Sequence, residues 1–213
     1  MTQSSYLGYT YPRLAQVIEL AKTCHYAAGH AEQVTRLSIL LFHELADVHF
    51  LPEKYLEWLI YAGILHDIGW LDGWRGHHKA SQNIILRTTL LPFTTNERMV
   101  ISNIARYHRG ALPKSGHELY TTLSSEDRAV VNVLGGMLRL ADGLDASHRS
   151  VVDDLLASTI PGKTTLTIHC RSTPTEEVQA AKRKKDLLMA ALNTEITIQW
   201  QQAPRPTRTF PIH

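Results

Sequence analysis

The sequence lacks the features that mark secreted and membrane proteins. It has only two cysteines, Cys24 and Cys170, in 213 residues, and they do not show the CxxC spacing of a metal site. No secretory signal precedes them, so we expect free thiols in a reducing cytoplasm. No apolar run approaches the roughly 20 residues that a bilayer-spanning helix needs. We therefore predict a cytoplasmic protein with no membrane partner.

An excess of charge of one sign is also missing. The chain has 22 basic and 20 acidic side chains, a net charge of +2. Electrostatic binding to nucleic acid needs basic residues clustered on one face, and composition alone does not provide them. We interpret the basic run 182–185 as the solvated face of a helix, with nucleic-acid binding as the disfavoured alternative.

What the chain does have is a core and many histidines. Hydrophobic residues make up 44% of the chain, enough for one domain to bury a core without disulfides. The 12 histidines are more than packing alone explains. Their number directs attention to metal chemistry.

Periodicity predicts a mainly α fold. From Tyr11 to Ala157 apolar residues recur at spacings of three and four, which is typical of amphipathic helices. Thr94 and Glu97 predict a capping box at the start of one of these helices. After residue 161 the pattern alternates, and it predicts a strand, a helix over Thr175 to Leu192 and a second strand. A third short strand is predicted at Thr209 to Ile212.

The expected organisation is therefore a helical domain over residues 1–160 and a small α+β appendage over residues 161–213. Because an appendage of about 50 residues is small for an independent core, we expect both parts to pack as one structural unit.

Several imidazoles and carboxylates lie at or near predicted helix ends. His66 and Asp67 are adjacent just before Gly69, where a helix is expected to stop. Neighbouring side chains on a continuous helix diverge by about 100°, so they converge on one ion most easily at a helix end. The other candidates of this kind are His30, His77, His78, His108, Asp142 and Asp145.

A mixed nitrogen and oxygen donor set suits one or two divalent ions. Manganese, iron, nickel, cobalt, zinc and magnesium all remain open, and the lack of thiolates argues against a structural zinc site. Such a set also leaves positions for water. These residues alone therefore predict a reactive metal site.

The order His30, His66-Asp67, Asp142 resembles the H…HD…D signature of the HD superfamily of metal-dependent phosphohydrolases. More closely, the stretches 76–81, 106–114 and 138–145 resemble the C-terminal HD-like domain of the exopolyphosphatase/guanosine pentaphosphate phosphohydrolase family. The strand-helix-strand end is similar too. The resemblance implies an HD-type helical bundle.

The resemblance also implies roles for individual residues. One ion is expected on His30, His66, Asp67 and Asp142, with Asp67 as a bridging carboxylate, and a second on His77 and His108. Apart from the resemblance, Lys79, Arg75 and Arg109 are candidates for positive charge beside a phosphate, with a solvated surface position as the equal alternative. Asp145, three residues after Asp142, is expected behind the ligands, where it orients a histidine or a water. His78 is placed in the same outer set and is expected to point away from the ions.

The chain departs from its relatives in two respects. Trp70 stands where two-metal phosphodiesterases of the cyclic-dinucleotide type carry a lysine. No segment resembles the actin-like domains in which the larger exopolyphosphatases hydrolyse phosphoanhydrides. The resemblance therefore does not imply exopolyphosphatase activity for this chain.

Two functions follow from these patterns. The first is a metal-dependent phosphohydrolase in which metal-activated water cleaves a phosphate ester of a nucleotide or a related small molecule. The second is a non-catalytic regulatory module that binds polyphosphate or nucleotide. Homodimer formation stays open.

Overall fold

The computed structural model describes residues 5–72 and 76–202, and it confirms the predicted mainly α fold. The strand predicted at Thr209 to Ile212 and the candidate Arg75 lie outside the described residues. A short antiparallel pair, β1 (Ser5–Tyr6) and β2 (Tyr9–Thr10), precedes the helices. The helices that follow are α1 (Leu14–Thr23), α2 (Ala28–Glu44), α3 (Ala46–His49), α4 (Lys54–Leu65), the 3-10 helix η1 (Ile68–Asp72), α5 (His77–Arg87), α6 (Thr95–Arg106), α7 (Glu118–Thr121) and α8 (Ser125–Gly143).

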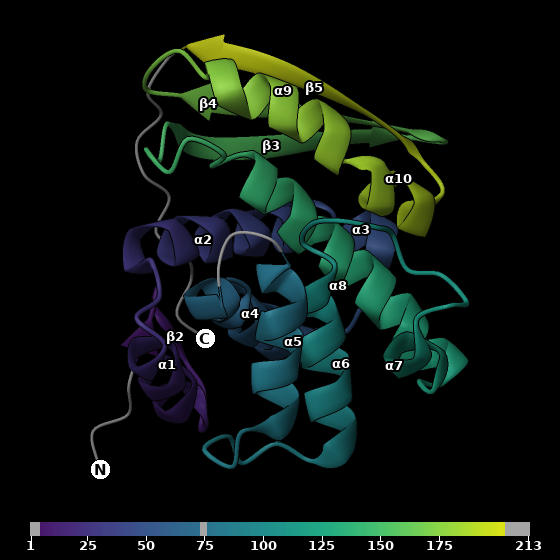
Figure 1. The fold of residues 1–213 in the computed structure, drawn as a ribbon. Helices are drawn as coiled ribbons and strands as arrows, with labels where there is room; N and C mark the ends of the chain where they lie inside the picture. The colour runs from purple at the N-terminus through teal and green to yellow at the C-terminus, as the bar shows by residue number, and fades with distance from the viewer. Residues whose placement is uncertain (1–4, 73–75, 203–213) are drawn as a thin grey trace.

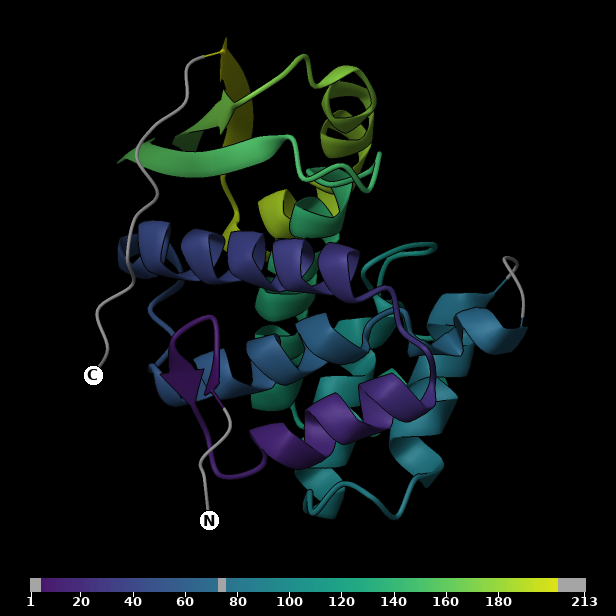
Figure 2. The ribbon, with the colours of Figure 1, turned by 90° about the vertical axis from the view of Figure 1, so that its left-hand side faces the viewer.

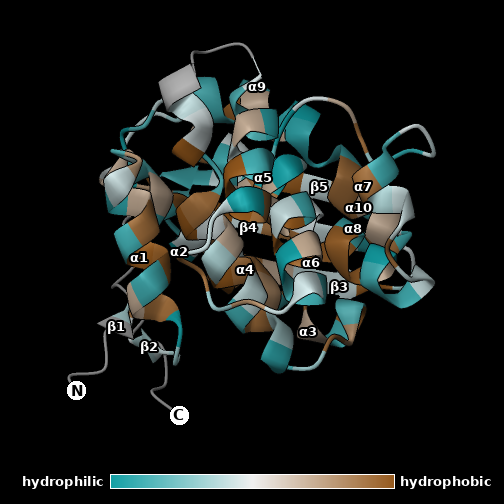
Figure 3. Ribbon diagram, turned by 60° about the horizontal axis from the view of Figure 1, so that its bottom comes forward, coloured by the Kyte–Doolittle hydropathy of each residue, from teal (hydrophilic) through white to brown (hydrophobic). Residues whose placement is uncertain are grey.

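The helices form where their sequences predict them because caps and apolar spacing agree. Thr94 and Glu97 form the predicted capping box of α6, and the Ser124 side chain accepts a hydrogen bond from the backbone of Asp127 at the start of α8. Figure 3 shows that α1 carries both hydrophobic and hydrophilic residues, and its buried residues are Leu14, Val17, Leu20 and Ala21. This spacing of three and four is that of an amphipathic helix. Helix α4 is buried over most of its length. Within the described residues, no helix combines the length and the hydrophobicity needed to cross a bilayer.

The C-terminal part contains a strand that the sequence pattern does not predict. Its elements are β3 (Val152–Ile160), β4 (Lys163–Cys170), α9 (Thr175–Lys184), α10 (Asp186–Leu192) and β5 (Glu195–Gln202). The sheet order is β3-β4-β5, with an antiparallel β3/β4 hairpin and a parallel β4/β5 pair joined by α9 and α10.

The prediction that the helical region reaches Ala157 is therefore wrong. The register of β3 shifts between Val152 and Asp154, and this irregularity breaks the period of two by which a strand is recognised. The expected boundary at residue 160 falls at the end of β3, in the hairpin that joins it to β4. The single helix predicted over Thr175 to Leu192 is divided at Lys185.

Helix α2 lies between strand β3 of the sheet and helix α4, as Figures 1 and 2 show from two directions. Helix α10 packs directly on α8, because Gly136 of α8 has no side chain. A Cβ at Gly136 would lie 2.8 Å from the backbone of Leu188. Arg139 of α8 donates two hydrogen bonds, of 2.7 and 3.0 Å, to the carboxylate of Asp186. Helix α9 packs on the C-terminal end of α8, where a Cβ at Gly143 would lie 3.3 Å from the backbone of Ala180 and Ala181.

Candidate metal centre

Asp67 lies at the centre of a buried cluster of imidazoles. It follows His66, the residue that caps the C-terminal end of α4, and is 8% exposed. Its Oδ2 lies 3.5 Å from His66 Nε2 and 3.9 Å from His30 Nε2. Its Oδ1 lies 3.2 Å from His77 Nε2 and 3.4 Å from His108 Nε2. The two oxygens of one carboxylate thus face two different pairs of histidines.

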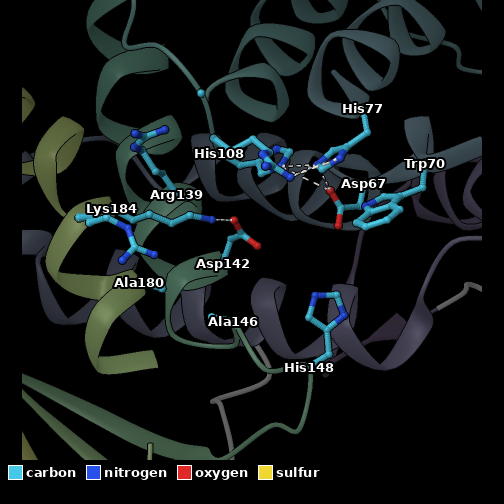
Figure 4. Close-up of a pocket in the computed structure, with 13 residues that line it drawn as sticks. Asp67, Trp70, His77, His108, Arg139, Asp142, Ala146, His148, Ala180 and Lys184 are labelled. Carbon is cyan, nitrogen blue, oxygen red and sulfur yellow. Dashed lines mark hydrogen bonds and ion pairs between the residues drawn. The ribbon is translucent and has the colours of Figure 1, made fainter. Parts of the chain in front are cut away.

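Two groups of potential ligands result. One is His30, His66 and Asp142, and the other is Asp67, His77 and His108, with the donor atoms of each group within 4.8 Å of one another. They come from α2, the end of α4, the start of α5, the end of α6 and the end of α8. The structure thus brings together all six residues that the sequence predicts as ligands. Figure 4 shows Asp67, His77, His108 and Asp142 around one pocket.

Hydrogen bonds fix the orientation of three of the rings. His30 Nδ1 lies 2.7 Å from Asp145 Oδ2, His66 Nδ1 lies 2.7 Å from Gly63 O, and His108 Nδ1 lies 2.7 Å from Ala105 O. Because each partner accepts, each Nδ1 carries the donated hydrogen. In the neutral form of each ring, Nε2 then carries no hydrogen and faces the cluster, as in histidines that bind metals.

The charges of the cluster have clear physical causes. Burial alone would raise the pKa of Asp67, but the imidazoles of His66, His77 and His108 outweigh burial and hold that pKa well below its usual value. Burial lowers the pKa of His108 far below its usual value, so this imidazole is neutral. A carboxylate anion and a neutral imidazole are the forms that bind a metal.

His30 behaves differently. Burial lowers its pKa, but the carboxylates of Asp142 and Asp145 outweigh burial and raise the pKa to about 9. A proton and a metal ion therefore compete for His30 Nε2.

Three potential ligand atoms of the cluster make no hydrogen bond to the described residues, and their nearest polar neighbours are other members of the cluster. His30 Nε2, His66 Nε2 and Asp67 Oδ1 are buried and make no hydrogen bond within residues 5–72 and 76–202. Buried polar atoms are otherwise nearly always satisfied. A set of inward-facing nitrogen and oxygen atoms without hydrogen bonds fits divalent ions of the kind that the sequence predicts.

Asp145, Arg109 and His78, which the sequence also predicts as site residues, lie around the six-residue cluster. Asp145 is fully buried and lies against His30, and its second oxygen accepts a hydrogen bond from the backbone of Ser150. Arg109 Nη1 lies 3.2 Å from His77 Nε2. His78 lies outside both ligand groups, and burial and nearby positive charges lower its pKa to about 4.

Lys79 is exposed and lines another pocket, next to Arg106 and His117. Its predicted contact with a phosphate at the metal site therefore has no support in the geometry.

Four residues near the cluster were not predicted as part of it. His148 stacks on His30 with ring centroids 3.7 Å apart, and Trp70 stacks on His77 at 4.9 Å. Arg183 and Lys184 of α9 line the same pocket, and Lys184 Nζ contacts Asp142 Oδ2. The interpretation of the basic run as a wholly solvated face is wrong for Lys184. The spacing of residues along α9 does not predict the contact between Lys184 and Asp142, because that contact depends on how α9 packs on α8.

The sequence from α1 to the start of β5 carries a family pattern. Residues 13–195 match the family model described as Ppx/GppA phosphatase, domain III. The chain belongs to this family. The match confirms the predicted relation to the exopolyphosphatase/guanosine pentaphosphate phosphohydrolase family and includes all six candidate ligands. No curated protein matches the sequence.

Proposed function

We propose that this protein is an HD-type metal-dependent phosphohydrolase that cleaves a phosphate ester of a nucleotide or a related small molecule. The main support is the pair of ligand groups joined by Asp67, in which buried nitrogen and oxygen atoms face one another and make no hydrogen bond within the described part of the chain. The order His30, His66-Asp67, Asp142 supports assignment to the HD superfamily.

The proposed ligands of one ion are His30, His66 and Asp142, and those of a second are His77 and His108, with Asp67 shared. Bound divalent ions supply a water of lowered pKa and neutralise charge on the phosphoryl oxygens. Asp145 holds the His30 ring through its Nδ1, and backbone carbonyls hold His66 and His108.

A pocket of about 410 Å³ opens beside the cluster and carries the charge that a phosphate needs. Arg109, Arg139, Arg183 and Lys184 line it. Arg139 is already paired with Asp186 and Lys184 with Asp142, so Arg109 and Arg183 are the better phosphate ligands. Fixed cations of this kind stabilise the developing negative charge of phosphoryl transfer. Trp70, which is 40% exposed, forms part of the wall.

Metal content tests the proposal most directly. Protein stripped with chelator and reloaded with Mn²⁺ is expected to retain about one or two ions per chain, by elemental analysis, and to melt at a higher temperature. His66→Ala should lose both effects, because His66 Nε2 faces the cluster. His25→Ala, which changes an exposed histidine, is the matched control. A wild-type protein that takes up no manganese, iron or nickel would refute the proposed site.

Lys184 is expected to compete with the metal. Its ammonium contacts Asp142 Oδ2, so an ion that binds Asp142 there must displace it. Lys184→Met should therefore bind Mn²⁺ about tenfold more tightly, which corresponds to about 1.4 kcal/mol. Calorimetric titration of the chelated protein measures this, with the exposed neighbour Lys182→Met as control. Weaker binding in Lys184→Met would show that Lys184 supports the metal site instead.

The same contact favours a second candidate function. An aspartate that Lys184 neutralises does not need a metal, and the pocket cations then suit a regulatory module that binds polyphosphate or nucleotide. Phosphate-ligand binding without metal uptake or hydrolysis would select this function.

A further inference from the structure

Arg106 is a buried cation without a counter-charge. It lies in the last turn of α6 and is 7% exposed. Its Nη1 is buried and makes no hydrogen bond, and no carboxylate lies within ion-pair distance in the part of the chain that the structure describes. The carbonyl end of α6 offers partial negative charge, and the Tyr107 ring centroid lies 5.6 Å from the guanidinium carbon. Neither replaces a full negative charge, and a buried unpaired charge is strongly unfavourable.

The guanidinium lines a pocket that is separate from the metal centre. This pocket has a volume of about 330 Å³ and shares no lining residue with the pocket beside Asp67. Its walls come from α5, the end of α6 and the segment that leads into α7. Tyr107 Oη lies 2.9 Å from His117 Nδ1, which holds the imidazole in the wall.

The electrostatics of the pocket favour an anion. Lys79 lines it together with Arg106, and Glu118, whose side chain is exposed, is the carboxylate in the lining. Burial lowers the pKa of His117, and the charges of Arg106, Lys114 and Lys79 lower that pKa further. The positive charges around the pocket thus disfavour protonation of His117.

We propose that this pocket binds a phosphate group, with the Arg106 guanidinium as its buried anchor and Lys79 as a second cation at the opening. A guanidinium matches two oxygens of a tetrahedral dianion at once, and the bond gains strength where water is excluded. The site needs no metal ion and does not depend on the proposed hydrolysis. It supplies a second place for a phosphorylated ligand on this domain.

The test uses the full chain with chelator present and inorganic phosphate as the probe. At a phosphate concentration ten times its dissociation constant, the wild-type protein is expected to melt roughly 3 °C higher than without phosphate. Sulfate should act similarly, because it is also a tetrahedral dianion, whereas acetate at equal ionic strength should not. Arg106→Met should abolish the shift. Without phosphate this variant should be at least as stable as the wild type, because it removes an unpaired buried charge.

A matched variant controls for the loss of one positive charge. Lys22→Met removes an exposed cation of α1 that lines neither pocket, and it should keep the phosphate response. If Arg106→Met does not fold, Lys79→Met should weaken phosphate binding about tenfold by calorimetry. The proposal is overturned if the wild-type protein does not respond to phosphate, if the response survives in Arg106→Met, or if Lys79→Met binds phosphate as the wild type does.

Discussion

Replacing Asp67 by alanine is expected to lower metal-dependent hydrolysis about 1,000-fold or more, because several kcal/mol of transition-state stabilisation come from a metal site. The Asp67 carboxylate faces both ligand groups, with His66 on one oxygen and His77 and His108 on the other. Its removal would deprive both of the proposed ions of their shared ligand. Steady-state rates on a panel of nucleotides and phosphate esters, with Mn²⁺ present, measure the effect.

The controls for this variant separate chemistry from folding. Far-UV circular dichroism of Asp67→Ala should stay close to that of the wild type, because Asp67 lies between α4 and η1 and contributes mainly to the site. Asp47→Ala, which removes an exposed aspartate of α3, should keep full activity. Wild-type turnover in Asp67→Ala would show that the assignment of the site is wrong.

The second large effect is expected at Gly69, where η1 packs against α5. A Cβ at this position would lie 2.3 Å from His77 O and 2.4 Å from Ser81 N, both backbone atoms. Gly69→Ala must therefore move α5, which carries His77, away from η1. We expect the free energy of unfolding to fall by about 2 kcal/mol, as for overpacked cores. We also expect kcat/KM to fall about 100-fold, because a ligand displaced by about 1 Å disturbs the reacting geometry.

Urea denaturation and steady-state kinetics of Gly69→Ala measure the two effects. Gly29→Ala is the matched control, because a Cβ at Gly29 of α2 meets nothing within 4 Å. Its stability should be unchanged or higher by up to about 1 kcal/mol. Equal stability of Gly69→Ala and the wild type would mean that η1 and α5 are not held as closely as the structure shows.

Local signals in the sequence were sufficient for most of the helices. The Thr94 capping box and the apolar spacing of α4 act within a few residues along the chain, so they can be recognised without a fold. Strand β3 could not be recognised in this way. The register shift at Val152 removes the alternation, and pairing with β4 determines the strand instead.

For the candidate site, the sequence indicated which residues belong together but not every neighbour. Six ligands were predicted from residue type, order and resemblance. The stacking of His148 on His30 was not, because His148 lies in an irregular segment with a positive φ of 56° and follows no periodic pattern.

The sequence by itself determined the helical framework through residue type and spacing along the chain. It indicated the relation to the exopolyphosphatase family and the candidate ligands through the resemblance of ordered motifs. Only the tertiary structure decided where the cations act. Packing of α9 on α8 brings Lys184 to Asp142, while α5 presents His77 to Asp67 and exposes Lys79 at the Arg106 pocket. The physical reason is that a helix period shows which residues share a face, whereas the contacts of that face depend on how the helices pack.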